Sequence, residues 1–140
     1  MMDWALGQNE HKVAIRVPTY SYEHSKGEVD KDYSDLNKFK VVKEGQDVAV
    51  IAAGDFFVKG EGVVNALADK GINATLINPR FVSGFDSELL DSLKHNHKVV
   101  VVLEDGSKEG GFGGRVAQAA GATRMKCLTF GLEKKFVDRY

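Results

Sequence analysis

The sequence has few of the residues that mark secreted, disulfide-rich or membrane proteins. It contains one cysteine, Cys127, and two prolines among 140 residues. A single cysteine can form neither an intramolecular disulfide nor a cysteine-based metal cluster, so we expect a reducing compartment, the cytoplasm. The longest apolar runs, Val48–Ala53 and Val99–Leu103, are far too short to cross a bilayer, and the N-terminus lacks the pattern of a signal peptide. We therefore expect no membrane partner.

The chain also lacks an excess of charge of either sign. It has 19 lysines and arginines against 20 aspartates and glutamates, which gives a formal net charge of −1. A nearly neutral chain without a concentrated basic stripe has no electrostatic reason to bind a polyanion. We therefore expect no nucleic-acid partner.

Short apolar runs alternate with amphipathic stretches from Gln46 onward. The predicted strands are Asp47–Ala53, Asn73–Asn78, Lys98–Leu103 and Lys126–Phe130. The predicted helices are Lys59–Lys70, a short helix capped by Asp86, and Arg115–Ala120. This order predicts an α/β sheet with helices on both faces and right-handed crossovers. Phe39–Val42 is expected to add an edge strand, and Gly71 to adopt a left-handed conformation after the first helix.

The first part of the chain has a different character. Val13–Val17 has the pattern of a strand and follows a possible short helix at Trp4–Leu6. Thr19–Asn37 is polar, contains several tyrosines and is poor in aliphatic residues, which is typical of a linker or of a loop lying across another surface. Because Val13–Val17 has no obvious partner strand, we interpret it as the tail of a preceding domain.

Ligands of parallel α/β sheets gather beyond the carboxyl ends of the strands. The residues expected there are Gly54-Asp55, Asn78-Pro79-Arg80, Glu104-Asp105-Gly106 and Gly131. Arg80 could bind a carboxylate or phosphate through two parallel hydrogen bonds, or form a structural ion pair with Asp86 or Glu104. Arg16 raises the same question, because an arginine inside an apolar strand needs a partner or a ligand. No set forms a catalytic triad or a metal site.

The glycine-rich loop Gly106–Gly114 could cradle a phosphate at the start of a helix. It lacks the Gly-Lys-Ser/Thr ending of a P-loop and the glycine spacing of a dinucleotide site. We therefore favour a tight turn that packs closely against another subunit.

The adjacent carboxylates Glu104 and Asp105 precede this loop. Adjacent side chains on a strand face opposite sides, which favours turn stabilisation over acid/base chemistry for this pair. The interface or loop residues predicted in this way are Glu104, Asp105, Gly110, Gly111 and Gly113.

Two further residue types are given structural roles. His95 and His97 lie in a polar segment and are interpreted as a solvated helix end. Cys127 is interpreted as a buried thiol rather than a nucleophile, because no basic environment surrounds it in the sequence. We predict no catalytic residue and no metal site in this chain.

Three long phrases of the sequence resemble a known family. They are DVAVIAAGDFFVKGEGVVNALADKGINATLINPRFVSGFDSELL, KVVVVLEDGSKEGGFGGRVAQ and FGLEKKFV, anchored by Asn78-Pro79-Arg80-Phe81-Val82, Asp86, Leu103-Glu104-Asp105 and Gly131-Leu132. Together they resemble the C-terminal domain of transketolase-like thiamine diphosphate enzymes, and within that family they look most like the 1-deoxy-D-xylulose-5-phosphate synthases. The resemblance implies a three-layer α/β/α sandwich with a five-stranded, mostly parallel sheet and one antiparallel edge strand.

The resemblance also divides the chain. His11–Pro18 looks like the closing strand of a pyrimidine-binding domain, which implies a domain tail at residues 1–18, a linker at 19–40 and a transketolase C-terminal-like domain at 41–140. In this family thiamine diphosphate and Mg²⁺ lie between the diphosphate-binding and pyrimidine-binding domains of a dimer. We therefore expect neither to bind this chain alone, and we expect the N-terminal domains and a second copy as its partners.

For the full enzyme, the resemblance implies condensation of pyruvate with glyceraldehyde 3-phosphate to 1-deoxy-D-xylulose 5-phosphate, a step towards isoprenoid precursors. It assigns Arg16 and Arg80 to the phosphate of this sugar acceptor. Two departures are Thr19 where the synthase pattern has a basic residue, and Glu133 where it has proline. They leave open a transketolase, a 2-oxo acid dehydrogenase beta subunit, or a noncatalytic module for dimerisation or ligand binding.

Overall fold

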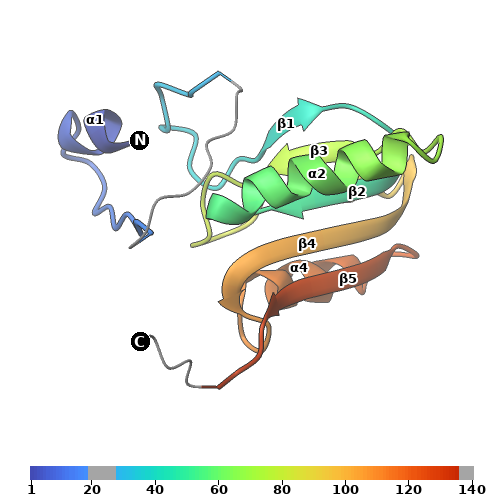
Figure 1. The fold of residues 1–140 in the computed structure, drawn as a ribbon. Coiled ribbons are helices and arrows are strands. Elements are labelled where there is room, and N and C mark those ends of the chain that lie inside the picture. Colours follow the sequence, from blue (N-terminus) through green and yellow to red (C-terminus); the bar gives the residue numbers. More distant parts are fainter. Residues whose placement is uncertain (19–27, 136–140) are drawn as a thin grey trace.

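The computed structural model describes residues 1–18 and 28–135 and contains one five-stranded sheet with helices packed against it (Figure 1). The elements in chain order are α1 (Met2–Leu6), β1 (Lys40–Lys43), β2 (Asp47–Ala52), the 3-10 helix η1 (Gly54–Phe56), α2 (Phe57–Ala68), β3 (Thr75–Asn78), α3 (Ser87–Leu93), β4 (His97–Ser107), α4 (Phe112–Ala120) and β5 (Lys126–Leu132). None of the helices in this described part is long and apolar enough to cross a membrane.

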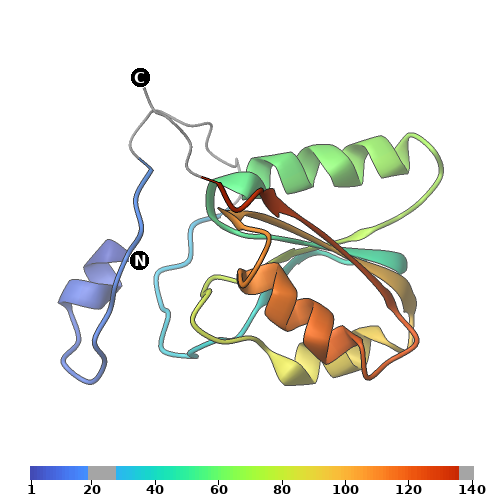
Figure 2. The same ribbon diagram turned by 90° about the horizontal axis from the view of Figure 1, so that it is seen from below.

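The strand order is β1-β3-β2-β4-β5. Strands β3, β2, β4 and β5 are parallel, and β1 pairs antiparallel with β3 at one edge. Helix α2 covers one face of the sheet, and α3 and α4 cover the other (Figure 2). The structure therefore confirms the α/β/α sandwich with one antiparallel edge strand.

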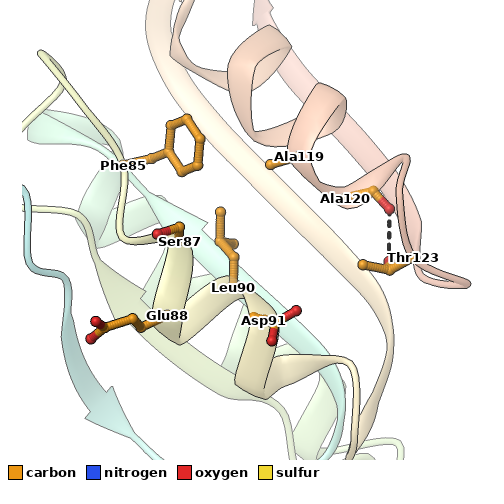
Figure 3. A pocket seen from close by; sticks show the side chains of 8 residues that line it. All are labelled: Phe85, Ser87, Glu88, Leu90, Asp91, Ala119, Ala120 and Thr123. Atoms are coloured by element: carbon orange, nitrogen blue, oxygen red, sulfur yellow. Dashed lines mark hydrogen bonds between the residues drawn. The ribbon is translucent and has the colours of Figure 1, made fainter.

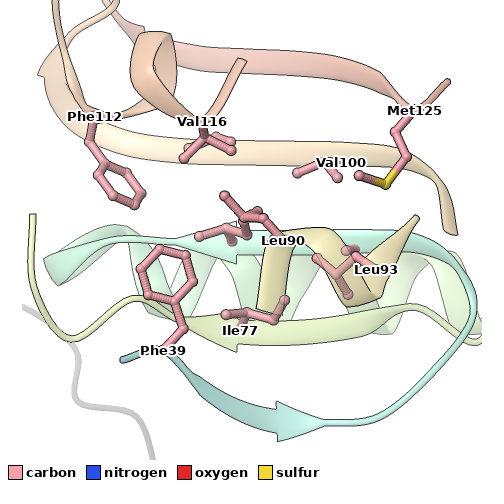
Figure 4. Close-up of a cluster of buried hydrophobic side chains, with 11 residues drawn as sticks. Phe39, Ile77, Leu90, Leu93, Val100, Phe112, Val116 and Met125 are labelled. Atoms are coloured by element: carbon pink, nitrogen blue, oxygen red, sulfur yellow. The ribbon is translucent and has the colours of Figure 1, made fainter. Parts of the chain in front are cut away.

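The central strand β2 is buried on both faces. Ala49 and Ile51 belong to the core beneath α3 and α4, while Val50 and Ala52 belong to the core beneath α2, and all four are fully buried. In the first core, Phe39, Ile77, Leu90, Leu93, Val100, Phe112, Val116 and Met125 converge between these two helices and the sheet (Figure 4). A strand with neighbours on both sides and helices on both faces is a continuous apolar run, as the sequence predicted.

Local signals in the sequence also hold. The Asp86 side chain accepts the backbone N–H of Leu89 at 3.1 Å and caps α3. Gly71 has a φ of +78°, the left-handed conformation expected after α2. Most boundaries differ by one or two residues. The largest differences are that β4 continues to Ser107 rather than ending at Leu103, and that α4 begins at Phe112 rather than Arg115.

The predicted strand at Val13–Val17 is wrong. The structure shows no regular secondary structure in this segment, which lies beside α1 beyond the carboxyl ends of the strands (Figures 1 and 2). A strand needs a ladder of hydrogen bonds to a neighbour, and the segment pairs with neither β1 nor β5 at the edges of the sheet. The assignment of residues 1–18 to a preceding domain stays a prediction. Residues 19–27 of the predicted linker lie outside the described part.

The interpretation of His97 as a solvated helix end is also wrong. His97 begins β4, is 9% exposed, and its Nε2 lies 2.8 Å from Thr75 Oγ1 while its Nδ1 lies 3.1 Å from the Leu93 carbonyl. Thr75 Oγ1 also accepts the Gly45 N–H at 2.9 Å. The imidazole therefore ties the starts of β3 and β4 to the end of α3.

Helix α2 contains two glycines, of which Gly60 packs closely against the sheet and Gly62 does not. A Cβ on Gly60 would lie 2.6 Å from the Ala52 Cβ, whereas a Cβ on Gly62 would meet nothing within 4 Å. We expect Gly60→Ala to lower the free energy of unfolding by about 1–3 kcal/mol, because α2 must move away from the sheet. We expect the control Gly62→Ala to raise it by about 0.5–1 kcal/mol. Urea unfolding followed by circular dichroism measures both, and equal changes would contradict this packing.

Candidate functional site

A cavity of about 310 Å³ lies at the carboxyl ends of the parallel strands. Its walls come from the segment before residue 19, from the turn after β2, from the turn after β3 and from the end of β4; the lining includes Val13, Ala14, Ile15, Arg16, Pro18, Ala53, Gly54, Asp55, Arg80, Phe81, Val82, Ser83 and Asp105. The cavity therefore brings together Arg16 and Arg80, which are 64 positions apart in the sequence.

The topology explains why a cavity forms here. The chain leaves β2 towards β3 on one side and later returns to β4 on the other side of β2. The two connecting helices, α2 and α3, then lie on opposite faces of the sheet (Figure 2). Loops diverge at such a switch point, and the crevice left between them is the usual ligand site of an open α/β sheet.

Arg80 begins from an unusual backbone conformation. Its φ is +60°, and its N–H donates to the Asn78 side-chain oxygen at 2.9 Å. A non-glycine residue in the left-handed region carries backbone strain, which such a side-chain hydrogen bond offsets. The Asn78 side chain therefore fixes the direction in which the Arg80 side chain leaves the sheet.

The ion-pair partner of Arg80 differs from both candidates in the sequence prediction. Its Nε lies 3.5 Å from Asp30 Oδ2, and its Nη2 donates to the Asp32 carbonyl at 2.6 Å. Asp86 instead caps α3, and Glu104 binds the start of α4. The Arg80 side chain is only 13% exposed, so it is largely covered by the segment that carries Asp30 and Asp32.

Arg16 forms an ion pair with the carboxylate of Asp105. Its side chain is 69% exposed, so the expectation of an arginine buried inside a strand is wrong. The reason is that its segment lies outside the sheet. Arg16 still reaches the cavity, because Asp105 at the end of β4 lines the same cavity.

Glu104 is buried and serves the glycine-rich loop. It is 5% exposed and accepts the backbone N–H groups of Phe112 at 2.9 Å and Gly113 at 2.8 Å. These are among the first N–H groups of α4, which have no partner within the helix. The negative charge also suits the positive end of the helix dipole. Glu104 therefore starts α4 three residues earlier than predicted.

The loop glycines have separate roles. A Cβ on Gly111 would lie 2.6 Å from Glu104 Oε1, and one on Gly113 would lie 3.0 Å from the same atom. Gly110 has a φ of +76°, where a side chain would strain the backbone. The amides that could have cradled a phosphate are thus engaged by Glu104. Packing of the loop against another subunit stays a prediction.

A cluster of aromatic side chains was missed in the sequence. The Tyr33 ring centroid lies 5.9 Å from that of Trp4 and 6.2 Å from that of Phe81, and the Arg80 guanidinium carbon lies 4.8 Å from the Tyr33 centroid. Burial, together with the Asp30 carboxylate, raises the pKa of the Tyr33 phenol. The sequence signal that could have revealed this cluster is Tyr33 itself, which lies among acidic residues in the segment interpreted as a linker.

A second hollow lies between α3 and α4, with a volume of about 390 Å³ (Figure 3). Phe85, Leu90 and Ala119 supply apolar surface there. Both carboxylates that line this hollow pair with lysines. Glu88 Oε2 lies 2.5 Å from Lys38 Nζ, and Asp91 pairs with Lys94, three residues along the chain. It offers shape but no free charged group for a small ligand.

Within residues 1–18 and 28–135, no group of three or more histidine, cysteine, aspartate or glutamate side chains could hold a metal ion. The side chains present therefore do not fit the Mg²⁺ that the family resemblance implies. Cys127 packs against the core beneath α4, and burial raises the pKa of its thiol. A thiol with a raised pKa is a poor nucleophile, in agreement with its predicted structural role.

The structural role of Glu104 can be measured. We expect Glu104→Gln to lower the free energy of unfolding by about 1–3 kcal/mol, because the amide presents a donor to one of the two buried N–H groups. The control is Glu88→Gln, whose side chain is 83% exposed, and its effect should stay within about 1 kcal/mol. Urea unfolding of both variants gives the comparison, and a loss for Glu104→Gln no larger than that of the control would refute the role.

The comparisons with known proteins agree with this geometry. Residues 37–134 match the family described as "Transketolase, C-terminal domain". A 1-deoxy-D-xylulose-5-phosphate synthase of Dehalococcoides mccartyi (strain CBDB1) is 30% identical over 129 residues, covering 89% of this chain and 20% of the relative. The synthase of Psychromonas ingrahamii is 36% identical over 116 residues, covering 80% of this chain and 18% of the relative.

A solved structure described as "Split gene transketolase, inactive beta4 tetramer" is 26% identical with a TM-score of 0.68, and the match covers 80% of this chain and 39% of that chain. These findings confirm the family resemblance inferred from the sequence. The chain spans about a fifth of the length of the curated relatives that it matches. The protein described here belongs to the transketolase C-terminal domain family.

Proposed function

We propose that this chain is the C-terminal part of a cytoplasmic, thiamine diphosphate-dependent 1-deoxy-D-xylulose-5-phosphate synthase. Such an enzyme condenses pyruvate with glyceraldehyde 3-phosphate. In this proposal the chain supplies part of the site for the acceptor's phosphate and part of a dimer interface. The observation that carries the proposal is that Arg16 and Arg80 line one cavity at the carboxyl ends of the strands.

The state of the Arg80 guanidinium supports a role in phosphate binding. Asp30 and the Asp32 carbonyl lie against the Nε–Nη2 edge. Among the residues that the structure describes, the Nη1 nitrogen has no hydrogen-bond partner. A planar guanidinium can donate to two phosphate oxygens along its Nη1–Nη2 edge, because each of these nitrogens carries two hydrogens.

Arg16 would act as the second cation. Its pair with Asp105 is exposed to solvent on the arginine side, and exposed pairs contribute little to stability. A phosphate group carries up to two negative charges and can compete with a single carboxylate for the same guanidinium. Asp55, which lines the same cavity, has a buried carboxylate oxygen without a hydrogen-bond partner among the described residues.

The division of labour follows from the side chains present. When bound, thiamine diphosphate supplies the carbanion chemistry. Because the described residues offer no metal site, we assign the cofactor and its Mg²⁺ to other domains of the enzyme. The residues of this chain would bind and orient the phosphorylated acceptor.

The proposed dimer interface includes strand β5 at the edge of the sheet. Phe130 is 53% exposed and Leu132 is 48% exposed, although both are large apolar side chains. Apolar side chains exposed on an edge strand favour contact with another chain. The related transketolase structure is described as a tetramer of one type of chain, which supports self-association.

A transketolase is the second candidate, and the similarity to the split-gene transketolase favours it. The proposed phosphate site would suit either enzyme if its acceptor carries a phosphate. The matched relatives do not favour a 2-oxo acid dehydrogenase beta subunit or a noncatalytic module over these two enzymes.

The role of Arg80 is tested in the enzyme that contains this domain together with its cofactor-binding domains. We expect Arg80→Gln to raise the KM for glyceraldehyde 3-phosphate by roughly ten- to a hundredfold, because charge-assisted hydrogen bonds to phosphate are lost. The KM for pyruvate should change little. The control is Arg124→Gln, an exposed arginine on the turn before β5. Equal losses for both substrates would rule out a phosphate-specific role.

Cofactor binding by this chain alone gives a separate test. We expect isothermal titration calorimetry of the 140-residue chain with thiamine diphosphate and Mg²⁺ to show no tight binding, since no described side-chain cluster could hold the metal. A dissociation constant in the micromolar range would place a cofactor site within this chain and overturn the proposed division of labour.

A further inference from the structure

One short segment, Asp30–Tyr33, holds the Arg80 guanidinium on two sides. Its acidic residue Asp30 and the carbonyl of Asp32 lie against one edge of the guanidinium, at 3.5 Å from Nε and 2.6 Å from Nη2. The ring of its aromatic residue Tyr33 lies beneath the guanidinium carbon, with 4.8 Å between this carbon and the ring centroid. The edge that carries Nη1 is left without a partner among the described residues.

Tyr33 is itself held in place by other aromatic rings. It is 9% exposed, and it packs against Trp4 of α1 at 5.9 Å and against Phe81, the residue after Arg80, at 6.2 Å. Trp4 also donates its indole N–H to Ser34 Oγ at 3.3 Å. The phenol ring is therefore a fixed surface on which a long, flexible side chain can rest.

We propose that Tyr33 is a positioning residue for Arg80, and that its ring presents the free edge of the guanidinium to an anionic phosphate in the cavity. The ring removes rotational freedom from Arg80 before the ligand arrives, so less entropy is lost on binding. The attraction between a guanidinium and a neutral aromatic face adds to this effect. The functional half of this inference rests on the proposed phosphate role of Arg80.

The ring, rather than the acidic residue, carries this role. Asp30 also lies 2.5 Å from the Lys40 ammonium, so two cations share its charge. The contact between Asp30 and the Arg80 Nε is also weak, because this nitrogen makes no hydrogen bond to any described residue. The Asp32 contact comes from the backbone, which no side-chain replacement removes. Tyr33 is thus the contact that substitution can delete while leaving the charges unchanged.

The alternative is that Asp30–Tyr33 competes with the anion. In that case the segment blocks the Arg80 guanidinium and must move away before an anion can bind. The two arrangements predict opposite effects of removing the ring. Loss of a positioning residue weakens anion binding, whereas loss of a competitor strengthens it.

The first measurement concerns the guanidinium itself and needs no ligand. In a proton–nitrogen correlation spectrum of the full chain, the Arg80 Nε–H signal is identified by its absence in Arg80→Lys. We expect Tyr33→Leu to remove the ring-current shift of this signal and to speed its hydrogen exchange by roughly three- to tenfold, while Tyr33→Phe keeps both close to wild type. An unchanged signal in a folded Tyr33→Leu protein would overturn the proposal.

The second measurement titrates inorganic phosphate into the same proteins. We expect Tyr33→Leu to weaken phosphate binding by roughly three- to tenfold and Tyr33→Phe to leave it within about twofold. Tighter binding by Tyr33→Leu would show that the segment competes with the anion, and would also overturn the proposal. If Arg80→Lys and Arg80→Gln bind phosphate as wild type does, the proposed function fails, while the first measurement still decides whether Tyr33 positions Arg80.

A second variant covers the case in which Tyr33→Leu does not fold. Trp4→Ala removes one of the rings that pack against Tyr33 and keeps the side chains of Tyr33 and Asp30, which contact Arg80. We expect this variant to keep its sheet, because Trp4 lies outside both cores, and circular dichroism checks this. We expect a smaller change of the Arg80 signal in the same direction. No change in this variant would count against a positioning role for the ring.

Discussion

The structure depends on the need to cover both faces of β2, whose Val50 and Ile51 are fully buried and point to opposite sides. Parallel neighbours require crossover connections, and right-handed crossovers to opposite sides of one strand place their helices on opposite faces. This requirement puts α2 on one face and α3 with α4 on the other (Figure 2). It also brings the carboxyl ends of β2, β3 and β4 to one edge, where the cavity lies. The location of the site is therefore a consequence of how the core is covered.

At that edge, each turn needs a polar group to complete its hydrogen bonds. Asn78 supports the strained backbone of Arg80, and Glu104 accepts the first N–H groups of α4. Both side chains make hydrogen bonds within the protein and are therefore not free to bind a ligand through the same atoms. The charged residues that line the cavity are Arg16, Arg80, Asp55 and Asp105. The proposed anion site uses the two arginines, whereas Glu104 is held by its hydrogen bonds to Phe112 and Gly113.

The sequence predicts well what depends on local periodicity and poorly what depends on distant partners. The apolar run of β2 and the cap at Asp86 are local signals, and both were found. Val13–Val17 has the correct alternation for a strand but no edge to pair with, a condition that lies outside the segment. Polar flanks suggested solvent around His97, but the sheet places the ring beside Thr75. Arg80 pairs with Asp30, 50 positions earlier, because an irregular segment crosses the end of β3. No local pattern encodes such a crossing.

The two arginines differ in what holds them at the cavity. Arg80 belongs to the sheet through Asn78, whereas Arg16 belongs to a segment outside the sheet. The Arg16–Asp105 pair cannot be the main attachment of that segment, because an exposed pair contributes about 0–1 kcal/mol and a phosphate would compete for it. The contacts of Trp4 with Tyr33 and Phe81 involve no residue that the proposed anion would displace, and aromatic pairs of this kind contribute about 0.5–1.5 kcal/mol each. In the proposed phosphate complex, the aromatic cluster would therefore keep Arg16 near Arg80 after Asp105 has been replaced by the ligand.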